Sequence, residues 1–364
     1  MMIGGIDMQP GRAPFPRNQW YVAALGSEIT RVPLHRRLFG DPVVLYRQQD
    51  GTPVALFDRC PHRGMRFSNG GKLIGDNLQC NYHGIQFQPS GRACLIPSGG
   101  AASASLSVRR YPLQEVSGWV WAWAGDIERA DPTLIPDHRE LGLTDPSMFA
   151  YFGARLDAAS NYLLSFENLV DATHITFLHH GLIDSGNVAA HPYEVDMSGV
   201  RVRVTRVFQR DVLPEMLVRS MHLSGGPVNR TLDLISYAPN VCVVRQHYVE
   251  SEQPHLPARE MRLVFAITPA GPRSCYQFVA VAQSFENHHP ALFDDLRRLL
   301  MEDVVALDDI QSLLDSLEPE HAPEVSVRSD EGGIRTRRII ARQIAAERAG
   351  TSVAGTRAGV QAIE

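Results

Sequence analysis

Residues 166–179 read FENLVDATHITFLH and place a carboxylate and two imidazoles in an otherwise apolar stretch. Asp171, His174 and His179 follow the spacing D-x2-H-x4-H. On a regular α-helix Asp171 and His174 share one face, whereas His174 and His179 point about 140° apart. Both imidazoles reach one metal ion only if the helix ends or bulges between them, and such bulges recur at functional sites. The alternative is a surface helix with two histidines that bind nothing.

Two histidines leave a metal ion short of ligands, and a mononuclear iron that activates O2 typically adds one carboxylate. We expect residues 290–317 to form a helix that starts at Pro290 and ends before Pro319. Asp303 is the single carboxylate on its apolar stripe, and a lone buried carboxylate is unfavourable unless it is paired or binds a metal. The alternative for Asp303 is a helix cap or an exposed side chain. The stripe consists of Phe293, Leu296, Leu300, Leu307, Ile310, Leu314 and Leu317.

Two short loops upstream each offer one thiolate and one imidazole. Residues 60–64 read CPHRG and residues 80–84 read CNYHG. A zinc finger places its later ligands on a helix, whereas each of these motifs ends in glycine and lies between strand-like segments. This context favours a Rieske [2Fe–2S] centre, in which one iron takes both thiolates and the other takes both imidazoles. The four candidate ligands are Cys60, His62, Cys80 and His83.

Composition describes an ordinary globular chain of 364 residues with 44% hydrophobic and 21% charged residues. A net charge of −5 gives no support to nucleic-acid binding. No run approaches 18 apolar residues and the first residues lack the apolar core of a signal peptide, so we expect a cytoplasmic protein without a membrane segment. Five cysteines then indicate metal ligands or buried thiols, with Cys94 as a buried thiol. We expect Arg335, Arg337 and Arg338 on a solvated helix face.

The chain divides into two expected domains. After a flexible arm over residues 1–17, short β-branched and aromatic runs over 18–125 predict an all-β domain, with Trp119, Trp121 and Trp123 packing its core. Residues 126–150 form a proline-containing linker. The second domain, 151–320, contains long alternating segments that predict antiparallel strands, and 321–364 form a C-terminal helix and tail. The alternating segments are 193–211, 231–249 and 261–282.

Taken together, CPHRG, CNYHG and FENLVDATHITFLHH resemble the terminal oxygenase component of Rieske non-haem iron systems. The resemblance runs from NQWYVAAL near residue 18 to the helix that ends near residue 319, and it is strongest to the single-subunit vanillate and dicamba O-demethylase type. It implies an α+β fold, in which an N-terminal all-β Rieske domain precedes a catalytic domain with helices around an antiparallel sheet.

The resemblance also implies roles for individual residues. His174, His179 and Asp303 would hold a mononuclear Fe(II), and the Rieske cluster would deliver electrons to it. Asp171 would orient the ring of His174 and bridge to the Rieske ligand His83. Two further residues have local roles: Asn168 is either a weak iron ligand or a hydrogen-bond partner, and Glu167 braces a subunit contact.

A protein of this type uses O2 and electrons that a separate NAD(P)H-dependent reductase supplies, with or without a ferredoxin. The chain fits that expectation because it lacks a glycine-rich dinucleotide fingerprint after a strand. The resemblance implies a homotrimer. A Rieske electron carrier would need only the first domain, and a zinc-stabilised binding module would be colourless.

The expected substrate is a small apolar aromatic compound, because residues 261–268 (MRLVFAIT) supply bulky apolar side chains. Arg245 and His247 are candidates to meet an anionic group, although exposed strand residues are more often solvated. We expect O-demethylation or N-dealkylation, with aromatic ring hydroxylation as the alternative, since one iron ligand set serves all three reactions.

Overall fold

The computed structural model describes residues 2–101, 103–186, 188–287, 292–318, 321 and 324–351. These residues form two compact units. One comprises Arg17–Ile135 with Thr268–Gly271, and the other comprises the residues up to Pro16, Pro136–Ile267 and the described residues from Pro272 onward. No helix in the described part of the chain is long and apolar enough to cross a membrane.

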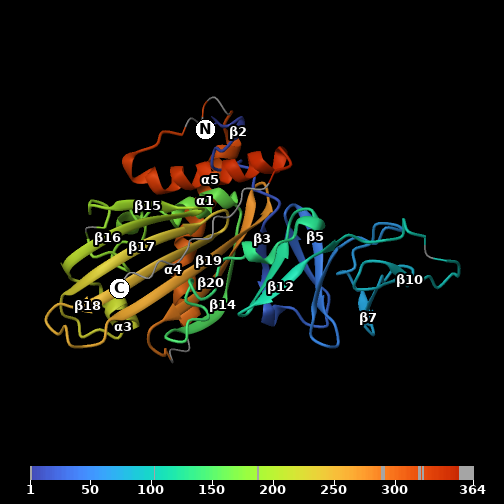
Figure 1. The fold of residues 1–364 in the computed structure, drawn as a ribbon, viewed down its shortest axis with the longest axis horizontal. Helices are drawn as coiled ribbons and strands as arrows, with labels where there is room; N and C mark the ends of the chain where they lie inside the picture. Colours follow the sequence, from blue (N-terminus) through green and yellow to red (C-terminus); the bar gives the residue numbers. More distant parts are fainter. Residues whose placement is uncertain are drawn as a thin grey trace. The chain divides into compact units, whose positions relative to one another are not determined.

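The smaller unit contains three antiparallel sheets (Figure 1). Trp119, Trp121 and Trp123 are at most 1% exposed, so they pack in its core as expected. One sheet has the order β12 (Leu113–Val116), β13 (Trp119–Trp123), β3 (Trp20–Leu25). The second has the order β11 (Arg110–Tyr111), β6 (Pro53–Phe57), β5 (Asp41–Arg47), β4 (Leu34–Leu38). The third has the order β10 (Ala93–Leu95), β9 (Gln86–Phe87), β8 (Asn77–Gln79), β7 (Lys72–Ile74).

The larger unit is built on one seven-stranded antiparallel sheet, which confirms the predicted α+β class with an all-β first domain. Its order is β14 (Phe149–Ala158), β20 (Ser274–Gln283), β19 (Arg259–Gly271), β18 (Val241–Glu250), β17 (Val228–Tyr237), β16 (Arg201–Asp211), β15 (Glu194–Ser198). The helices are α1 (Tyr162–Asn168), α2 (Ile175–Leu178), α3 (Glu215–Ser220), α4 (Leu292–Ser316) and α5 (Glu331–Arg348).

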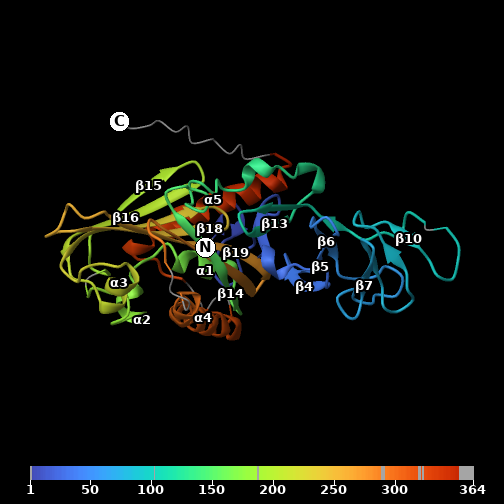
Figure 2. The same ribbon diagram turned by 90° about the horizontal axis from the view of Figure 1, so that it is seen from below.

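Three helices cover one face of this sheet. Phe166 of α1, Leu300 of α4 and Ile340 of α5 belong to the same buried cluster as Leu263 and Phe265, which share one face of β19. Figure 1 shows α5 beside α1 and β16, and Figure 2 shows α4 beside β14. The interior of the larger unit therefore lies between this face and the helices.

The opposite face carries ion pairs. Arg245 pairs with Glu260 at 2.7 Å and with Asp233 at 3.2 Å. His247 lies two residues along the same strand and shares that face, whereas Gln246 points to the helix-covered face. Arg245 and His247 thus do not face the interior of the larger unit, and Arg245 is already paired with two carboxylates, so neither residue is placed to meet an anionic group of a substrate there.

The N-terminal arm is packed, not flexible. Met8 and Ala13 are buried in the core of the larger unit. Gln311 of α4 donates a hydrogen bond to the carbonyl of Gly11 at 3.0 Å, and Asn161 donates one to the carbonyl of Ala13 at 3.1 Å. The prediction of a flexible arm over residues 1–17 is wrong, because residues from distant parts of the chain hold the arm in place. The arm contains two short paired strands, β1 (Met2–Ile3) and β2 (Ile6–Asp7).

The apolar stripe of α4 is confirmed in its first half. Leu296, Leu300, Leu307 and Asp303 are all buried, but Ile310 is 44% exposed. Farther along, Leu317 is 36% exposed and Gln311 is the buried residue at 2%. The carbonyl of Gly11 in the N-terminal arm accepts a hydrogen bond from Gln311. The buried face of α4 is therefore polar at this position, not apolar. The side chain of Phe293 and the prolines at 290 and 319 lie outside the described residues.

Helix α5 contains a buried ion-pair cluster. Arg337 is 3% exposed. Its Nη2 donates a hydrogen bond to Glu167 Oε2 of α1 at 2.6 Å, and its Nη1 donates one to Glu324 Oε2 at 2.6 Å. The solvated face expected for Arg337 is therefore wrong, because two carboxylates compensate its charge inside the structure. Glu167 is engaged within its own chain.

Candidate metal centres and substrate cavity

The stretch 166–179 is not one helix. Helix α1 ends at Asn168, and α2 begins only at Ile175, with His174 at its N-terminal cap and His179 at its C-terminal cap. His179 has φ −104° and ψ 31°, which are not helical values. Because the helix is interrupted, the two imidazoles can point to the same side, and their ring centroids lie 5.4 Å apart.

His174, His179 and Asp303 converge. One ligand atom from each lies within 4.8 Å of the others. Asp303 Oδ1 lies 3.1 Å from His179 Nε2 and 3.5 Å from His174 Nε2. Two imidazole nitrogens and one buried carboxylate oxygen are the donor set that suits a divalent iron, with further positions left open. The residues present therefore fit a mononuclear metal ion.

Two neighbours orient this group. Asn168 Nδ2 donates a hydrogen bond to Asp303 Oδ1 at 3.2 Å. Glu302 Oε2 lies 2.8 Å from His179 Nδ1, the ring nitrogen that faces away from Asp303. Glu302 was not among the residues predicted from the sequence, although it stands directly beside Asp303. A carboxylate on the far nitrogen fixes the orientation of a ligating imidazole.

Burial and charge act differently on the two imidazoles. Burial lowers the pKa of His174, although the charge of Asp303 opposes this effect. Burial also acts to lower the pKa of His179, but its contacts with Asp303 and Glu302 outweigh it and raise that pKa. A metal ion needs the neutral imidazole. Burial of His174 therefore favours its neutral, metal-binding form.

Asp171 lies beside the group, but its carboxylate has another partner. It accepts hydrogen bonds from the Thr173 backbone N–H at 2.9 Å and from the Thr173 hydroxyl at 2.5 Å. The charge of Asp171 and its backbone carbonyl both act to raise the pKa of His174, against the larger effect of burial. Burial lowers the pKa of Arg206, which is 2% exposed, and the charge of Asp171 opposes that effect.

The two Cys–His loops of the smaller unit share one backbone geometry. The N–H of Cys60 donates to the carbonyl of Met65 at 2.8 Å, and the N–H of Cys80 donates to that of Ile85 at 2.9 Å. In each loop the glycine N–H then donates back to the cysteine carbonyl. These glycines, Gly64 and Gly84, have φ values of 81° and 70°, where a side chain would be strained.

This geometry brings the four candidate cluster ligands together. The thiols of Cys60 and Cys80 are buried and interact, while His62 and His83 are exposed with ring centroids 4.6 Å apart. Burial, together with Cys80, raises the pKa of Cys60 to about 11. Two paired sulfurs and two paired imidazoles fit a [2Fe–2S] cluster of the Rieske type.

Cys94, outside this set, is exposed. The expectation of a buried thiol is corrected, since its position on the edge strand β10 leaves the side chain at the surface.

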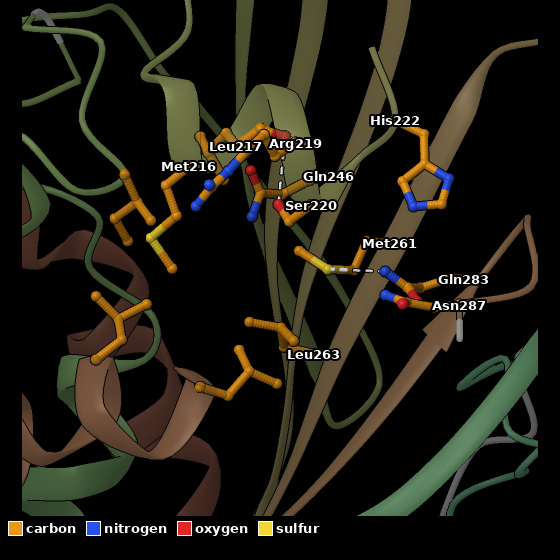
Figure 3. Close-up of a pocket in the computed structure, with 13 residues that line it drawn as sticks. Met216, Leu217, Arg219, Ser220, His222, Gln246, Met261, Leu263, Gln283 and Asn287 are labelled. Carbon is orange, nitrogen blue, oxygen red and sulfur yellow. Dashed lines mark hydrogen bonds between the residues drawn. The ribbon is translucent and has the colours of Figure 1, made fainter. Parts of the chain in front are cut away.

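A small cavity of about 60 Å³ lies at the histidines and Asp303. A larger cavity of about 270 Å³, whose lining residues are drawn in Figure 3, lies next to it. Four residues line both cavities, so the two cavities are neighbours. Met261 also lines the larger cavity, as the apolar segment 261–268 predicted. The shared residues are Ile183, Gln246, Leu263 and Leu299.

Comparison with known proteins agrees with both centres. Residues 19–112 match the Rieske [2Fe–2S] domain, and residues 158–346 match the vanillate O-demethylase oxygenase C-terminal domain. The chain is 30% identical to the dicamba O-demethylase oxygenase component of Stenotrophomonas maltophilia, over 90% of this chain and 97% of that protein. The chain belongs to the Rieske non-haem iron oxygenases.

Other Rieske oxygenases extend the comparison. The vanillate O-demethylase oxygenase subunit of Pseudomonas sp. (strain HR199 / DSM 7063) is 30% identical, over 92% of this chain and 96% of that protein. The crystal structure of dicamba monooxygenase bound to 3,6-dichlorosalicylic acid is 29% identical in sequence and superimposes with a TM-score of 0.84. The match covers 93% of this chain and the whole of the dicamba monooxygenase chain. This Rieske oxygenase is thus an oxidoreductase, the oxygenase component of a multicomponent system, and neither a zinc module nor a simple electron carrier.

Proposed function

We propose that this Rieske oxygenase O-demethylates or N-dealkylates a small, mostly apolar aromatic compound at a mononuclear Fe(II) held by His174, His179 and Asp303. The observation that carries the proposal is the position of this convergent donor set beside an apolar cavity. The relatives support it, since they are named dicamba and vanillate O-demethylase components and, at 27% identity, a chloroacetanilide N-alkylformylase component of Rhizorhabdus wittichii.

The reaction balances with external electrons. An aromatic methyl ether, O2, two electrons and two protons give a phenol, formaldehyde and water. The iron, when bound, supplies the site at which O2 is activated. The chain's own residues hold that ion, exclude water with the apolar wall of the larger cavity, and orient His179 through Glu302.

The electrons enter through the smaller unit in this proposal. Cys60, His62, Cys80 and His83 hold the [2Fe–2S] cluster, and the exposed imidazoles of His62 and His83 present it to a partner. A separate NAD(P)H-dependent reductase, with or without a ferredoxin, supplies the electrons. The working unit is a homotrimer in which Asp171 connects His83 of one chain to His174 of the next.

The deciding experiment supplies the purified holoprotein with a purified ferredoxin–reductase pair and NADH. Methoxyarenes, N-methylanilines and unsubstituted arenes are compared for product and for formaldehyde. Formaldehyde in equal amount to the phenol or aniline supports the proposal. Hydroxylated ring products without formaldehyde would replace it by ring hydroxylation, and NADH oxidation by the chain alone would overturn the need for a reductase.

A further inference from the structure

One buried side chain in the larger cavity lacks a satisfactory partner. Gln283, the last residue of β20, is 0% exposed. Its Nε2 donates to the thioether sulfur of Met261 at 3.7 Å, and thioether sulfur is a weak acceptor. Its Oε1 makes no hydrogen bond to any described residue. A buried acceptor without a donor destabilises the folded chain, so this arrangement needs a reason.

Gln283 lies at the end of the cavity away from the metal ligands. It lines the larger cavity but not the small one that contains His174, His179 and Asp303. Figure 3 shows its side chain next to Asn287 at the cavity wall. A ligand that fills the larger cavity can therefore bring a donor to Gln283 Oε1 while another part of it faces the metal.

A second carboxamide lies at the metal end. Gln246 lines both cavities, and its Oε1 accepts hydrogen bonds from Arg230 at 3.1 Å and from the hydroxyl of Tyr248. Arg230 can only donate, so the oxygen of Gln246 must face it and the NH2 group must point away. Neither hydrogen bond uses Nε2. Gln246 therefore offers a fixed donor where the two cavities meet.

No buried side chain among the described residues that line the larger cavity is charged, whereas the buried Arg230 lines the small cavity. None of the described residues that line the larger cavity is Asp or Glu. Arg219 and His222 are its basic residues, and both are exposed, so water screens their charge. Burying a full charge against two neutral amides is unfavourable compared with binding a neutral polar group.

We propose that Gln283 and Gln246 select the substrate, which is a neutral aromatic ether or N-alkyl arene with an O–H or N–H donor on the ring. The donor binds Gln283 Oε1. The ether oxygen or the amine nitrogen beside the carbon to be oxidised accepts from Gln246 Nε2. This inference rests on the proposed function and adds the chemical class that the cavity takes.

The test uses pairs of compounds that differ only in one donor. Methoxyarenes with a free phenol or a primary amide are paired with their O-methyl or N,N-dimethyl counterparts. The first pair is 4-methoxyphenol and 1,4-dimethoxybenzene, because Gln283 lies away from the metal ligands and Gln246 lies beside them. Their affinities for the anaerobic holoenzyme are measured by calorimetry. We expect the donor-bearing member to bind about tenfold more tightly, the effect of one well-placed hydrogen bond. Gln283→Leu should abolish this preference.

Equal affinities within every pair would overturn the proposal, as would tighter binding of the corresponding benzoates, which would assign an anionic class instead. Failure of the proposed function gives a different result. If Gln283 selects the ligand but the reaction is not dealkylation, the preference persists while no compound yields formaldehyde. If dealkylation occurs without this selection, formaldehyde appears and the preference is absent.

Thermal unfolding separates a ligand-binding role from a structural one. Gln277 is a matched control on the same strand and the same face, 3% exposed, with Nε2 bonded to Ser165 Oγ at 3.2 Å. Gln277→Leu should lower Tm, because it removes a satisfied buried hydrogen bond. Gln283→Leu should leave Tm unchanged or raise it. If Gln283→Leu lowers Tm as much as Gln277→Leu does, Gln283 is structural and the proposal fails.

Discussion

Glu302 and His179 form the contact that fixes the candidate iron site from outside: Glu302 Oε2 lies 2.8 Å from His179 Nδ1, while Asp303 Oδ1 lies 3.1 Å from Nε2 of the same ring. Adjacent residues of α4 thus hold both nitrogens of one imidazole. The side chain of Glu302 is 38% exposed and that of Asp303 only 7% exposed, which divides the two carboxylates into an outer support and an inner ligand candidate.

Replacing Asp303 by alanine should remove the mononuclear iron and leave the [2Fe–2S] cluster in place. Asp303 is the carboxylate of the convergent set, and the cluster belongs to the other compact unit. Iron per chain and the visible spectrum check both parts. Asp309→Ala is the control, since Asp309 is an exposed residue of the same helix. Full retention of iron and activity in Asp303→Ala would make Asp308 the next candidate.

Removing the outer support should weaken iron binding without abolishing it. Glu302→Ala frees the ring of His179, and losses of this kind typically cost about 10–100-fold in metal affinity. Glu302→Gln keeps an oxygen that can accept the Nδ1–H, so it should recover part of the affinity. Competition with a chelator measures both variants. An affinity equal to that of the wild type in Glu302→Ala would show that packing alone orients the ring.

The buried cluster around Arg337 should make stability depend on pH. Burial raises the pKa of Glu167 to about 7, although Arg337 acts in the opposite direction. The folded state therefore holds a proton that the unfolded state releases near its ordinary pKa of 4.5. Its contribution to stability is complete below pH 4.5 and is lost as the pH rises to about 7.

We expect the free energy of unfolding to fall by about 1–3 kcal/mol over this range through Glu167. Glu167→Gln mimics the protonated form and should remove this part of the pH dependence. Urea unfolding of both proteins between pH 5 and 7.5 measures the difference. Parallel pH profiles would mean that Arg337 keeps Glu167 ionised throughout.

Most of the candidate site followed from local spacing. Helical spacing predicts Asp303 as the buried carboxylate on an apolar stripe, and helix geometry predicts a break between His174 and His179. The glycines of the Cys–His loops marked turns that the structure confirms. Each of these features is encoded within a few turns of helix or a single loop.

The remaining features depend on contacts between distant segments. The N-terminal arm is ordered by Gln311 and Asn161, which lie far along the chain. Glu302 reaches a ring 123 residues away. Strand alternation places Gln246 and Gln283 on the inner face, but only the packed structure shows which buried carboxamide has its hydrogen bonds satisfied.

Electron transfer between chains can be separated from transfer within one chain by combining two inactive variants. His83→Ala removes a Rieske ligand, and Asp303→Ala removes the iron ligand, so no single chain holds both centres. In a head-to-tail ring, one type of mixed interface pairs an intact cluster with an intact iron site. Co-expressed mixtures should therefore recover part of the formaldehyde-forming activity.

Each variant expressed alone provides the background rate, and mixing the proteins after purification tests whether the rings exchange subunits. Background activity in co-expressed, demonstrably mixed rings would assign transfer to a single chain. Asp171→Asn completes the argument, because it removes the charge of Asp171 while Thr173 can still bond to its amide oxygen. If Asp171 connects the centres, this variant should retain the iron and the cluster yet turn over much more slowly. Normal turnover in Asp171→Asn together with recovery in the mixture would mean that electrons cross the interface by another route.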